Sequence, residues 1–414
     1  MSIRHLASAG VLAVAVAWAP TPTAAQPAVS ASVPFTLADA LARARDESPE
    51  AAAMRARVDA ARLAAGHAGW LPNPVVEFRT ENLASGVSRS ILPLDTFAEV
   101  TQVIELGGKR AARRAVAEAE AGGVAAAAAV LDARVALEVS RGYLDAVRLR
   151  ERHRALAAHV ADLIEAARVL ERRVAVGATA GSELLRVQTE AARAGSDLVR
   201  TELAASRALV ALTSRLAVET TLDALVAPPA PGLPTADEAA VSRRPDMAAA
   251  SRTVDTARQG LRLEDARAVP DPAVNAGYKR TVGYNTAQVT VSVPIPLFNR
   301  NRPARILAEG QVRAAELERT ATERRARGEL AATRAAAVAL TLRAQDARAT
   351  LVEPAIGARD AARAAFSTGV LDVLRLVDAE RTFTEATLVA IDLEVDAVVA
   401  AIEARLAAGE DPLP

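Results

Sequence analysis

The side chains that most often catalyse reactions or bind metals are sparse in this chain of 414 residues. It contains no Cys and four His. His153 and His159 are six positions apart, so they do not share a helix face as a metal-binding pair does, and His67 stands alone. The Gly pairs at 107–108 and 122–123 lack the spacing of a phosphate-binding loop, and no Ser-His-Asp arrangement stands out. The sequence therefore predicts no enzyme, no cofactor and no metal site.

The amino-acid composition argues against several of the remaining classes of protein. The chain has 50 Lys and Arg against 50 Asp and Glu, so no excess of cations is available to follow a nucleic-acid backbone. Aromatic residues make up only 3%, whereas Ala is abundant, which favours long, closely packed helices over a bulky globular core. The absence of Cys predicts no disulfide and no Cys-anchored lipid.

The first residues have the pattern of an export signal. Arg4 and His5 precede an apolar run over 6–18, and small residues follow up to Ala25. We therefore expect a signal peptide over 1–25 with cleavage near Ala25. The alternative, a membrane anchor, is disfavoured because a spanning helix needs about 20 apolar residues. No later segment approaches that length, so any membrane insertion is expected to be by strands.

The rest of the chain has the sequence pattern of one structural unit that occurs twice. Residues 48–78 resemble residues 244–278, with matching Pro-X-Pro pairs, and the segment after Gly177 resembles the segment after Gly369. The stretch APPAPGLP at 227–234 is rich in residues that break helices and strands. We expect a tandem duplication with repeats over 36–226 and 235–409, joined by a linker over 227–234.

Each repeat has the same predicted order of elements. A helix, over 37–68 or 236–267, is followed by a Pro-X-Pro breaker, two strands and a very long helical region. A helix over 108–176 would be about 100 Å long at about 1.5 Å per residue, more than a compact domain needs. Gly177 and Gly369 are predicted to form the tips of helical hairpins, where the chain turns back.

Four strands are predicted, over 75–82, 96–106 and 273–281 and within 287–297. In the last, apolar residues from Ala287 to Leu297 alternate with polar ones, so the strand has one apolar and one polar face. Four strands cannot close a membrane barrel, because the smallest have about eight. Either the sheet is a small soluble one packed on a helix, or several chains share one barrel; three chains would give twelve strands.

The motifs EVTQVIELGGKRAARRAVAEAE (99–120) and VTVSVPIPLFNRNRPARILAEGQV (289–312), with the two Gly tips, carry a family resemblance. Over essentially the whole mature chain, the sequence resembles the TolC-type outer-membrane efflux proteins, particularly their CzcC-like cation-efflux branch. The resemblance implies a mainly α fold with a small β part. Duplicated long α-hairpins would form a periplasmic α-barrel, and four strands per chain would contribute to a 12-stranded transmembrane β-barrel in a homotrimer.

The resemblance also implies a function. The trimer would be an outer-membrane exit channel that docks on a periplasmic membrane-fusion adaptor and, through it, on an inner-membrane pump of the resistance–nodulation–division (RND) type. Its substrates would be heavy-metal cations; drug efflux and type I secretion are the alternatives. A rival from another class is a periplasmic coiled-coil scaffold without a channel, whose strands would be buried against other protein.

Two sets of residues take functional roles through the resemblance. The hairpin tips would contact the adaptor, although each tip Gly also serves as an ordinary helix C-cap. These tip residues are Arg173, Gly177, Ala178, Thr179, Ser367, Thr368, Gly369 and Val370. In the family, acidic residues six and nine positions after the second tip Gly constrict the closed aperture.

This chain departs from the family at the first of those aperture positions. It has Arg375 at plus six and Asp378 at plus nine, so an unbroken acidic ring is not expected. Across a trimer, Arg375 is expected to pair with Asp378 or Asp372 and lock the aperture by charge. Ordinary surface charges without a special role are the alternative.

The places where strand passes into helix are expected to be structural. Gly and Asn suit tight turns and helix starts, and prolines end regular strand pairing. We expect these junctions at the periplasmic rim of the barrel, where Pro294 and Pro296 mark the bend into the helical part. The junction residues are Gly107, Gly108, Lys109, Arg110, Pro294, Pro296, Asn299 and Arg300.

Overall fold

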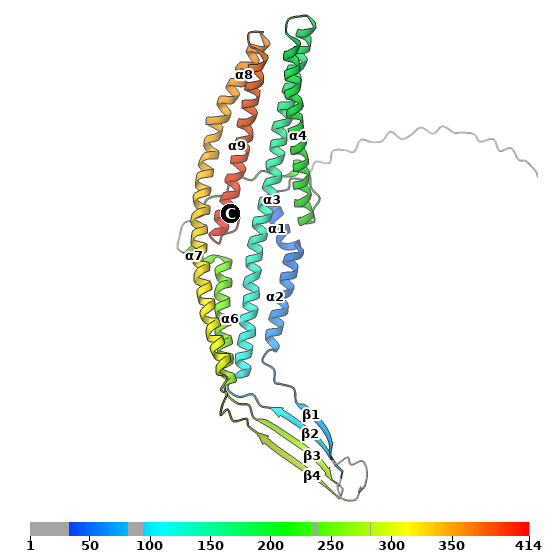
Figure 1. Cartoon of the computed structure of the whole chain (residues 1–414), viewed down its shortest axis with the longest axis vertical. Helices are drawn as coiled ribbons and strands as arrows, with labels where there is room; N and C mark the ends of the chain where they lie inside the picture. The colour runs from blue at the N-terminus through cyan, green and yellow to red at the C-terminus, as the bar shows by residue number, and fades with distance from the viewer. Residues whose placement is uncertain (1–32, 82–93, 235–238, 282, 414) are drawn as a thin grey trace, which may run out of the picture.

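The computed structural model describes residues 33–81, 94–234, 239–281 and 283–413. The expected signal peptide over 1–25 lies outside the described residues. The molecule is elongated: helices run side by side along most of its length, and one sheet projects from their lower end (Figure 1). Two helical hairpins end at the opposite extremity.

The order of elements in the first half recurs in the second. Each half has a helix, two strands, a long helix and a helix that returns from the far end. The first half contains α1 (Leu37–Glu47), α2 (Pro49–His67), β1 (Val75–Glu81), β2 (Asp95–Val103), α3 (Lys109–Ala175), α4 (Gly181–Leu216) and a 3₁₀ turn η1 (Leu222–Ala224). The second contains α5 (Ala239–Arg243), α6 (Pro245–Arg267), β3 (Ala273–Thr281), β4 (Tyr284–Ser292), α7 (Arg302–Ala347), a π-helical turn η2 (Arg348–Val352), α8 (Glu353–Ser367) and α9 (Val373–Ala407).

The long helix expected over 108–176 is confirmed as α3, but the first helix of each half is broken. Ser48 has extended backbone angles, and its hydroxyl accepts a hydrogen bond from the Ala51 amide at 3.4 Å. Ser48 is therefore the N-cap of α2, with Pro49 in the first helical position. Arg244, with extended backbone angles, and Pro245 interrupt the second helix at the equivalent place, but the Arg244 side chain does not cap the helix.

The four predicted strands are present, and two of them end earlier than expected. β2 stops at Val103 rather than 106, because its partner β3 begins at Ala273, directly after Pro272, which has no N–H to donate. β4 spans Tyr284–Ser292, so its pairing ends before Pro294. The residues up to Leu297 lie beyond the strand.

The helices form a single curved layer. α3 packs against α2 and α6 near the sheet and against α4 and α9 farther along, while α7 packs against α6 and then α9. One edge of the layer is therefore made by α2 and α4, and the other by α7 and α8. None of the helices in the described part of the chain has an apolar stretch long enough to cross a membrane.

Close helix packing relies on Ala. The buried positions of α7 are all Ala, which lets neighbouring helix axes approach closely. They are Ala308, Ala315, Ala326, Ala337 and Ala347. The largest buried cluster lies at the middle of the molecule, where α1, α3, α4 and α9 meet near the C-terminal end.

At this central cluster, Tyr143 ties three segments together. Its side chain is completely buried, and its hydroxyl donates to the Phe35 carbonyl at 2.6 Å and accepts from the Val226 amide at 2.9 Å. Phe35 and Leu225 are bridge partners in adjacent chain segments. The Arg150 guanidinium donates to the Leu225 carbonyl beside them. The connection between the halves is thus fastened to the middle of α3.

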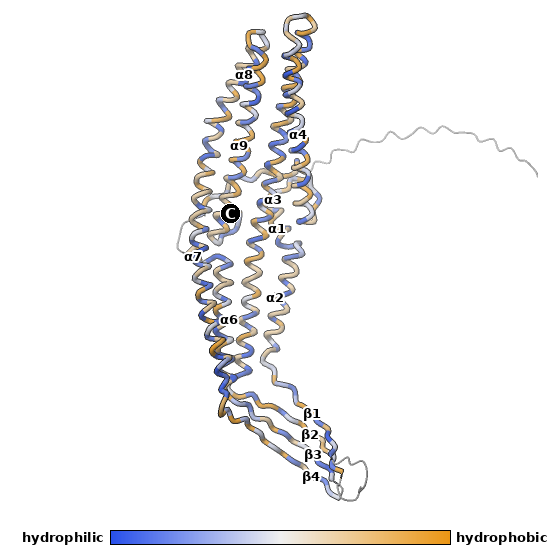
Figure 2. The backbone as a smooth tube through the Cα atoms, in the orientation of Figure 1, coloured by the Kyte–Doolittle hydropathy of each residue, from blue (hydrophilic) through white to orange (hydrophobic). Residues whose placement is uncertain are grey.

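The four strands form one antiparallel sheet in the order β1-β2-β3-β4, and its two faces differ. Over most of the sheet, register places apolar side chains opposite one another on one face and charged or polar ones on the other, although Arg280 lies on the first face and Phe97 on the second. The apolar face includes Val76, Phe78, Ala98, Val100, Val274, Ala276, Tyr278, Ala287, Val289 and Val291. The polar face includes Glu77, Arg79, Asp95, Glu99, Thr101, Asn275, Lys279, Gln288 and Thr290. Figure 2 shows that hydrophobic and hydrophilic residues are mixed along the strands.

Replacing Tyr143 with Phe should lower the free energy of unfolding by about 1–3 kcal/mol, because the buried Phe35 carbonyl and the partly exposed Val226 amide each lose one hydrogen bond. Thermal or denaturant unfolding followed by circular dichroism measures the change. Tyr278→Phe, at a half-exposed position of the sheet, is the matched control and should change stability little. Equal stability of Tyr143→Phe and wild type would contradict this role.

Candidate functional sites: the helical tips and the strand-to-helix junctions

The two hairpin tips have nearly the same backbone geometry and lie at the same end of the molecule (Figure 1). Gly177 has φ +72° and Gly369 has φ +78°, the left-handed region that favours Gly. The Ala178 amide donates to the Arg173 carbonyl at 2.8 Å, and the Val370 amide donates to the Ala365 carbonyl at 3.0 Å. Each tip is therefore a helix C-cap, as the sequence predicts.

Arg173 connects one tip to the other. Its guanidinium lies over the Phe366 ring, 4.6 Å from the centroid, and donates to the Phe366 carbonyl at 2.8 Å. It also reaches the Ser367 carbonyl at 3.5 Å. The C-terminal end of α8 is thus held against α3 by a cation–π contact and charge-assisted hydrogen bonds.

A second connection lies inside the hairpins. Arg363 on α8 forms ion pairs with Asp162 on α3 and with Glu380 on α9, and donates to Glu380 Oε2 at 2.9 Å. The Glu380 residue is only 3% exposed. The hydrogen bonds that Arg363 donates to Glu380 raise the pKa of Arg363 against the opposing effect of burial. This cluster joins three helices, so separating the two hairpins must break it.

Charged side chains of α9 near the second tip are not brought together within the chain. The Asp372 carboxylate accepts from the Leu374 amide at 3.3 Å and caps α9. Arg375 and Asp378 are exposed, and neither forms an ion pair with a described residue of the same chain. The expected pairing of Arg375 was across copies of the chain, so it stays a prediction.

At the first junction, Lys109 is nearly buried and joins the two halves. Its ammonium group lies 2.5 Å from Asp271 Oδ1 and donates to the Val269 carbonyl. Burial opposes ionisation of Asp271, but hydrogen bonds from Lys109 and from the Leu106 amide outweigh it and lower the Asp271 pKa. Gly107, with φ +67°, approaches so closely that a Cβ would lie 2.7 Å from Val269.

Arg110 and Arg113 complete this junction. Arg110 donates to the Gly69 carbonyl at 2.9 Å. Arg113 donates to the Ala68 and Trp70 carbonyls and forms an ion pair with Glu105, which lowers the Glu105 pKa. The end of α2 is therefore fixed to the start of α3, next to Gly108 at the helix N-cap.

The second junction is fixed through Asn301. It has φ +59°, and its side-chain amide donates to the Glu264 carbonyl at 2.8 Å and to Glu264 Oε2 at 2.7 Å. Asn299 accepts a hydrogen bond from the Asn301 amide at 2.9 Å. The turn containing Pro294, Pro296 and Arg300 is thus anchored to the end of α6.

The cluster of Asp162, Arg363 and Glu380 was not predicted from the sequence. One signal was available: the inward-facing residues of α9 follow at 373, 376, 380 and 384, and Glu380 is the charged member of that row. Asp162 and Arg363 carry no comparable signal, because their pairing depends on how three separate helices meet.

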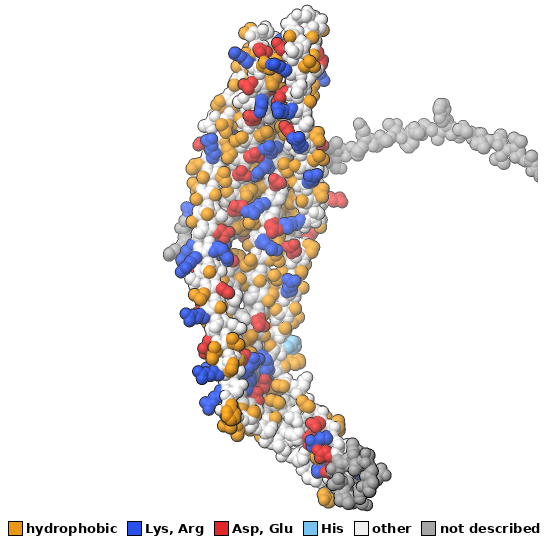
Figure 3. All heavy atoms as spheres, in the orientation of Figure 1, with side chains coloured by type: hydrophobic (Ala, Val, Ile, Leu, Met, Phe, Trp, Pro, Cys, Tyr) orange, Lys and Arg blue, Asp and Glu red, His pale blue; other side chains and the backbone are white. Residues whose placement is uncertain are grey.

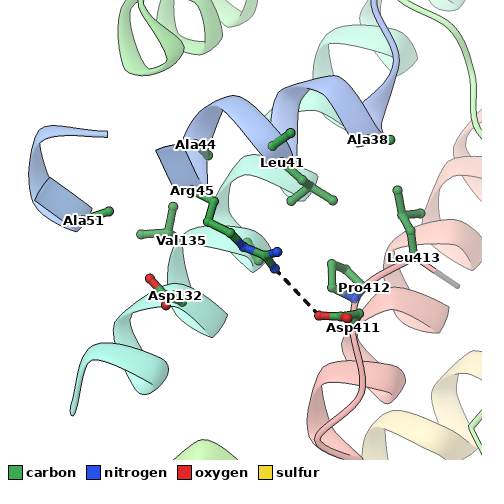
Figure 4. Close-up of a pocket in the computed structure, with 12 residues that line it drawn as sticks. Ala38, Leu41, Ala44, Arg45, Ala51, Asp132, Val135, Asp411, Pro412 and Leu413 are labelled. Carbon is green, nitrogen blue, oxygen red and sulfur yellow. Dashed lines mark ion pairs between the residues drawn. The ribbon is translucent and has the colours of Figure 1, made fainter. Parts of the chain in front are cut away.

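A cavity of about 230 Å³ lies beside α1 and the C-terminal end, which Figure 1 places at the middle of the molecule, far from the tips; Figure 4 shows its lining residues. Arg45 crosses its opening toward Asp411, with 3.8 Å between the charged groups, and Val135 and Leu413 line its wall. Both charged side chains are exposed, so the pair contributes little stability. Among the described residues, no group of three His, Cys, Asp or Glu side chains is placed to hold a metal ion.

Comparisons with known proteins agree with the fold. Residues 238–410 match the family described as "Outer membrane efflux protein". The chain is 28% identical over 376 residues to the cobalt-zinc-cadmium resistance protein CzcC of Cupriavidus metallidurans, covering 86% of each protein.

Solved structures show the same architecture at lower sequence identity. CusC superimposes with a TM-score of 0.77 at 16% identity, covering 92% of this chain and 93% of that one. A membrane protein from Pseudomonas aeruginosa gives 0.76 at 20% identity, covering 92% and 91%. The outer membrane protein VceC of Vibrio cholerae gives 0.74 at 18% identity, covering 91% and 96%. The family match thus covers the second half of the chain, and the solved structures show that the chain shares its fold with these proteins over most of its length.

Proposed function

We propose that the protein is the outer-membrane exit channel of a tripartite efflux system, working with a periplasmic adaptor and an inner-membrane RND-type pump. The observation that carries this proposal is the two-faced sheet. Its apolar face leaves Phe78, Val289 and Val291 largely exposed in the single chain. A contiguous exposed apolar face of this kind marks a surface covered by a partner or by lipid.

The edges of the sheet indicate how copies assemble. Among the described residues, β1 and β4 each pair on one side only, so each has a row of free backbone donors and acceptors. Such an edge cannot lie in lipid, because no water is present there to satisfy it. If β4 of each copy pairs with β1 of the next, the contact is heterologous and closes into a ring. Three copies would give twelve strands, within the range of membrane barrels.

The edges of the helical layer support the same arrangement. The outer side of α7 carries an exposed row of small and apolar residues at alternating spacings of three and four, interrupted only by Arg324: Leu307, Gly310, Ala314, Leu317, Ala321, Gly328, Ala331, Ala335, Val338 and Leu342. A row without charges follows the outer side of α4: Leu185, Thr189, Ala192, Ser196, Val199, Leu203, Ser206 and Val210. A seven-residue repeat of this kind is typical of a left-handed helix–helix seam.

The mechanism that we propose is passive conduction. The polar face of the sheet would line a water-filled interior, and the charged helices would continue it through the periplasm. Energy would come from the pump. We infer heavy-metal cations as the transported substrates because of the relative named for cobalt, zinc and cadmium resistance. Drug efflux and type I secretion are the competing substrate classes.

We further propose that the hairpin tips dock the adaptor and that the periplasmic aperture opens there. The Arg363 cluster and the contact of Arg173 with Phe366 hold the two hairpins together, so opening requires these interactions to rearrange. Exposed Arg375 would add a charge at the same end, pairing with Asp378 or Asp372 of a neighbouring copy.

Val289→Arg should abolish stable insertion into the outer membrane, because an arginine on a lipid-facing strand costs about 2–4 kcal/mol near the bilayer centre. Thr290→Arg, one residue along on the polar face, is the matched control and should insert normally. Membrane fractionation and heat-modifiable migration on gels measure both. Equal recovery of the two variants in the membrane would contradict the assignment of faces; recovery of wild type only in the soluble periplasm would instead support the scaffold.

Arg363→Gln should shift the channel toward its open state, because the ties from α8 to α3 and α9 are lost. Single-channel conductance in planar bilayers should therefore rise by several fold. Arg348→Gln removes only an exposed pair with Glu353 and should behave as wild type. If both variants conduct as wild type does, the cluster does not restrain the aperture.

A photoreactive amino acid in place of Val370, whose side chain is largely exposed at the tip, should cross-link to a periplasmic adaptor in cells. The same group in place of Arg200, halfway along α4, should not. Mass spectrometry identifies the captured adaptor. The class of inner-membrane pump that works with this adaptor then shows whether metals or drugs are exported. Capture at Arg200 alone would contradict docking at the tips.

A further inference from the structure

The turn between β4 and α7, residues 293–302, exposes large apolar side chains on a fixed backbone. Ile295 and Leu297 are 76% and 72% exposed, and Phe298 is fully exposed. The turn is nevertheless held in place, since Asn301 is bonded to Glu264 on α6 and the Leu297 amide donates to the Ile295 carbonyl at 2.9 Å. Apolar side chains held outward in this way indicate a surface that something covers.

The apolar residues of the turn continue those of the strand. Val289 and Val291 belong to the apolar face of β4, and Val293, Ile295 and Leu297 extend the same every-second-residue pattern toward the helices. On the proposed function, that face contacts the hydrocarbon core of the membrane. The turn would then lie at the membrane boundary on the helical side, where amphipathic and aromatic side chains concentrate.

Two unpaired cations border this apolar turn. Arg300 and Arg302 are exposed, and neither guanidinium forms a hydrogen bond or ion pair with a described residue. Arg302 is also the first residue of α7, whose first turn has no acidic residue. The partial positive charge of a helix N-terminus adds to that of the two arginines. Figure 3 shows basic and apolar side chains close together where the helices approach the sheet.

We propose that the turn over 293–302 anchors the protein to phospholipids with anionic headgroups at the periplasmic boundary of the membrane. Phe298 and Leu297 enter the boundary between headgroups and acyl chains, while Arg300 and Arg302 bind the phosphates. This inference rests on the proposed function, because it requires the sheet to stand in a membrane.

A neighbouring copy fits the turn less well. The opposite edge of the chain, which would approach β4 in a ring, presents residues 66–76, GHAGWLPNPVV, at the equivalent height. That segment offers apolar side chains such as Trp70 but no carboxylate. It therefore leaves both arginines without a counter-charge, which an anionic lipid supplies.

The test compares lipids retained by the full-length protein. Wild type, Arg300→Gln/Arg302→Gln and Arg313→Gln/Arg319→Gln are inserted in vesicles of equal phosphatidylcholine and phosphatidylglycerol. Lipids bound after extraction are then counted by native mass spectrometry. The second pair, exposed on α7 farther from the sheet, is the matched control. Wild type and control should favour phosphatidylglycerol, and the junction variant should lose this preference by about fivefold per arginine.

Several outcomes would overturn the inference while leaving the channel intact. They are a wild type that inserts but retains both lipids equally, a junction variant with an unchanged preference, and equal losses in both double variants. Dissociation of the junction variant into monomers would assign the turn to subunit contact instead. A wild type that does not enter the vesicles at all would contradict the proposed function itself, which separates the two failures.

Discussion

The free backbone groups along β1 and β4 are the constraint on which the rest of the proposed assembly depends. In water, such edges are merely prone to pairing, but in hydrocarbon each unsatisfied group costs several kcal/mol. A chain that offers one apolar sheet face and two open edges therefore lacks the partners that would complete it. Three copies would supply those partners and leave no edge.

The helical part follows the same geometry. Its single layer has two free edges, on which lie the uncharged row of α4 and the α7 row that only Arg324 interrupts. Within each chain, by contrast, charged side chains connect separate elements. Lys109 with Asp271 connects the halves beside the sheet, and Arg363 with Glu380 connects the hairpins near the tips. Both ends are thus joined by partly buried ion pairs, in which the more buried member, Lys109 or Glu380, is costly to leave unpartnered.

Local signals predicted most of the fold. Alternation around Val289, the prolines after Ser292 and the isolated Gly177 and Gly369 gave strands, strand ends and tips, because each reflects a backbone preference within a few residues. The expected assembly of three copies was inferred from the family resemblance and not from these local signals. The Arg363 cluster could not be predicted in the same way, because its partners lie far apart in sequence and meet only when three helices pack. The break at Ser48 was not predicted, because the helical pattern continues across it and only the capping hydroxyl of Ser48 indicates a new helix start.

The most direct measurement of the central claim is disulfide cross-linking between β1 and β4, for which a chain without Cys gives no background. Pairs of cysteines, one in each edge strand, would be scanned for register in membranes from cells that produce the protein. The account predicts covalent dimers and trimers, no larger species, and no cross-link when only one strand carries the cysteine. A protein that stays monomeric for every pair, or forms an open series of larger species, would contradict a closed ring of three.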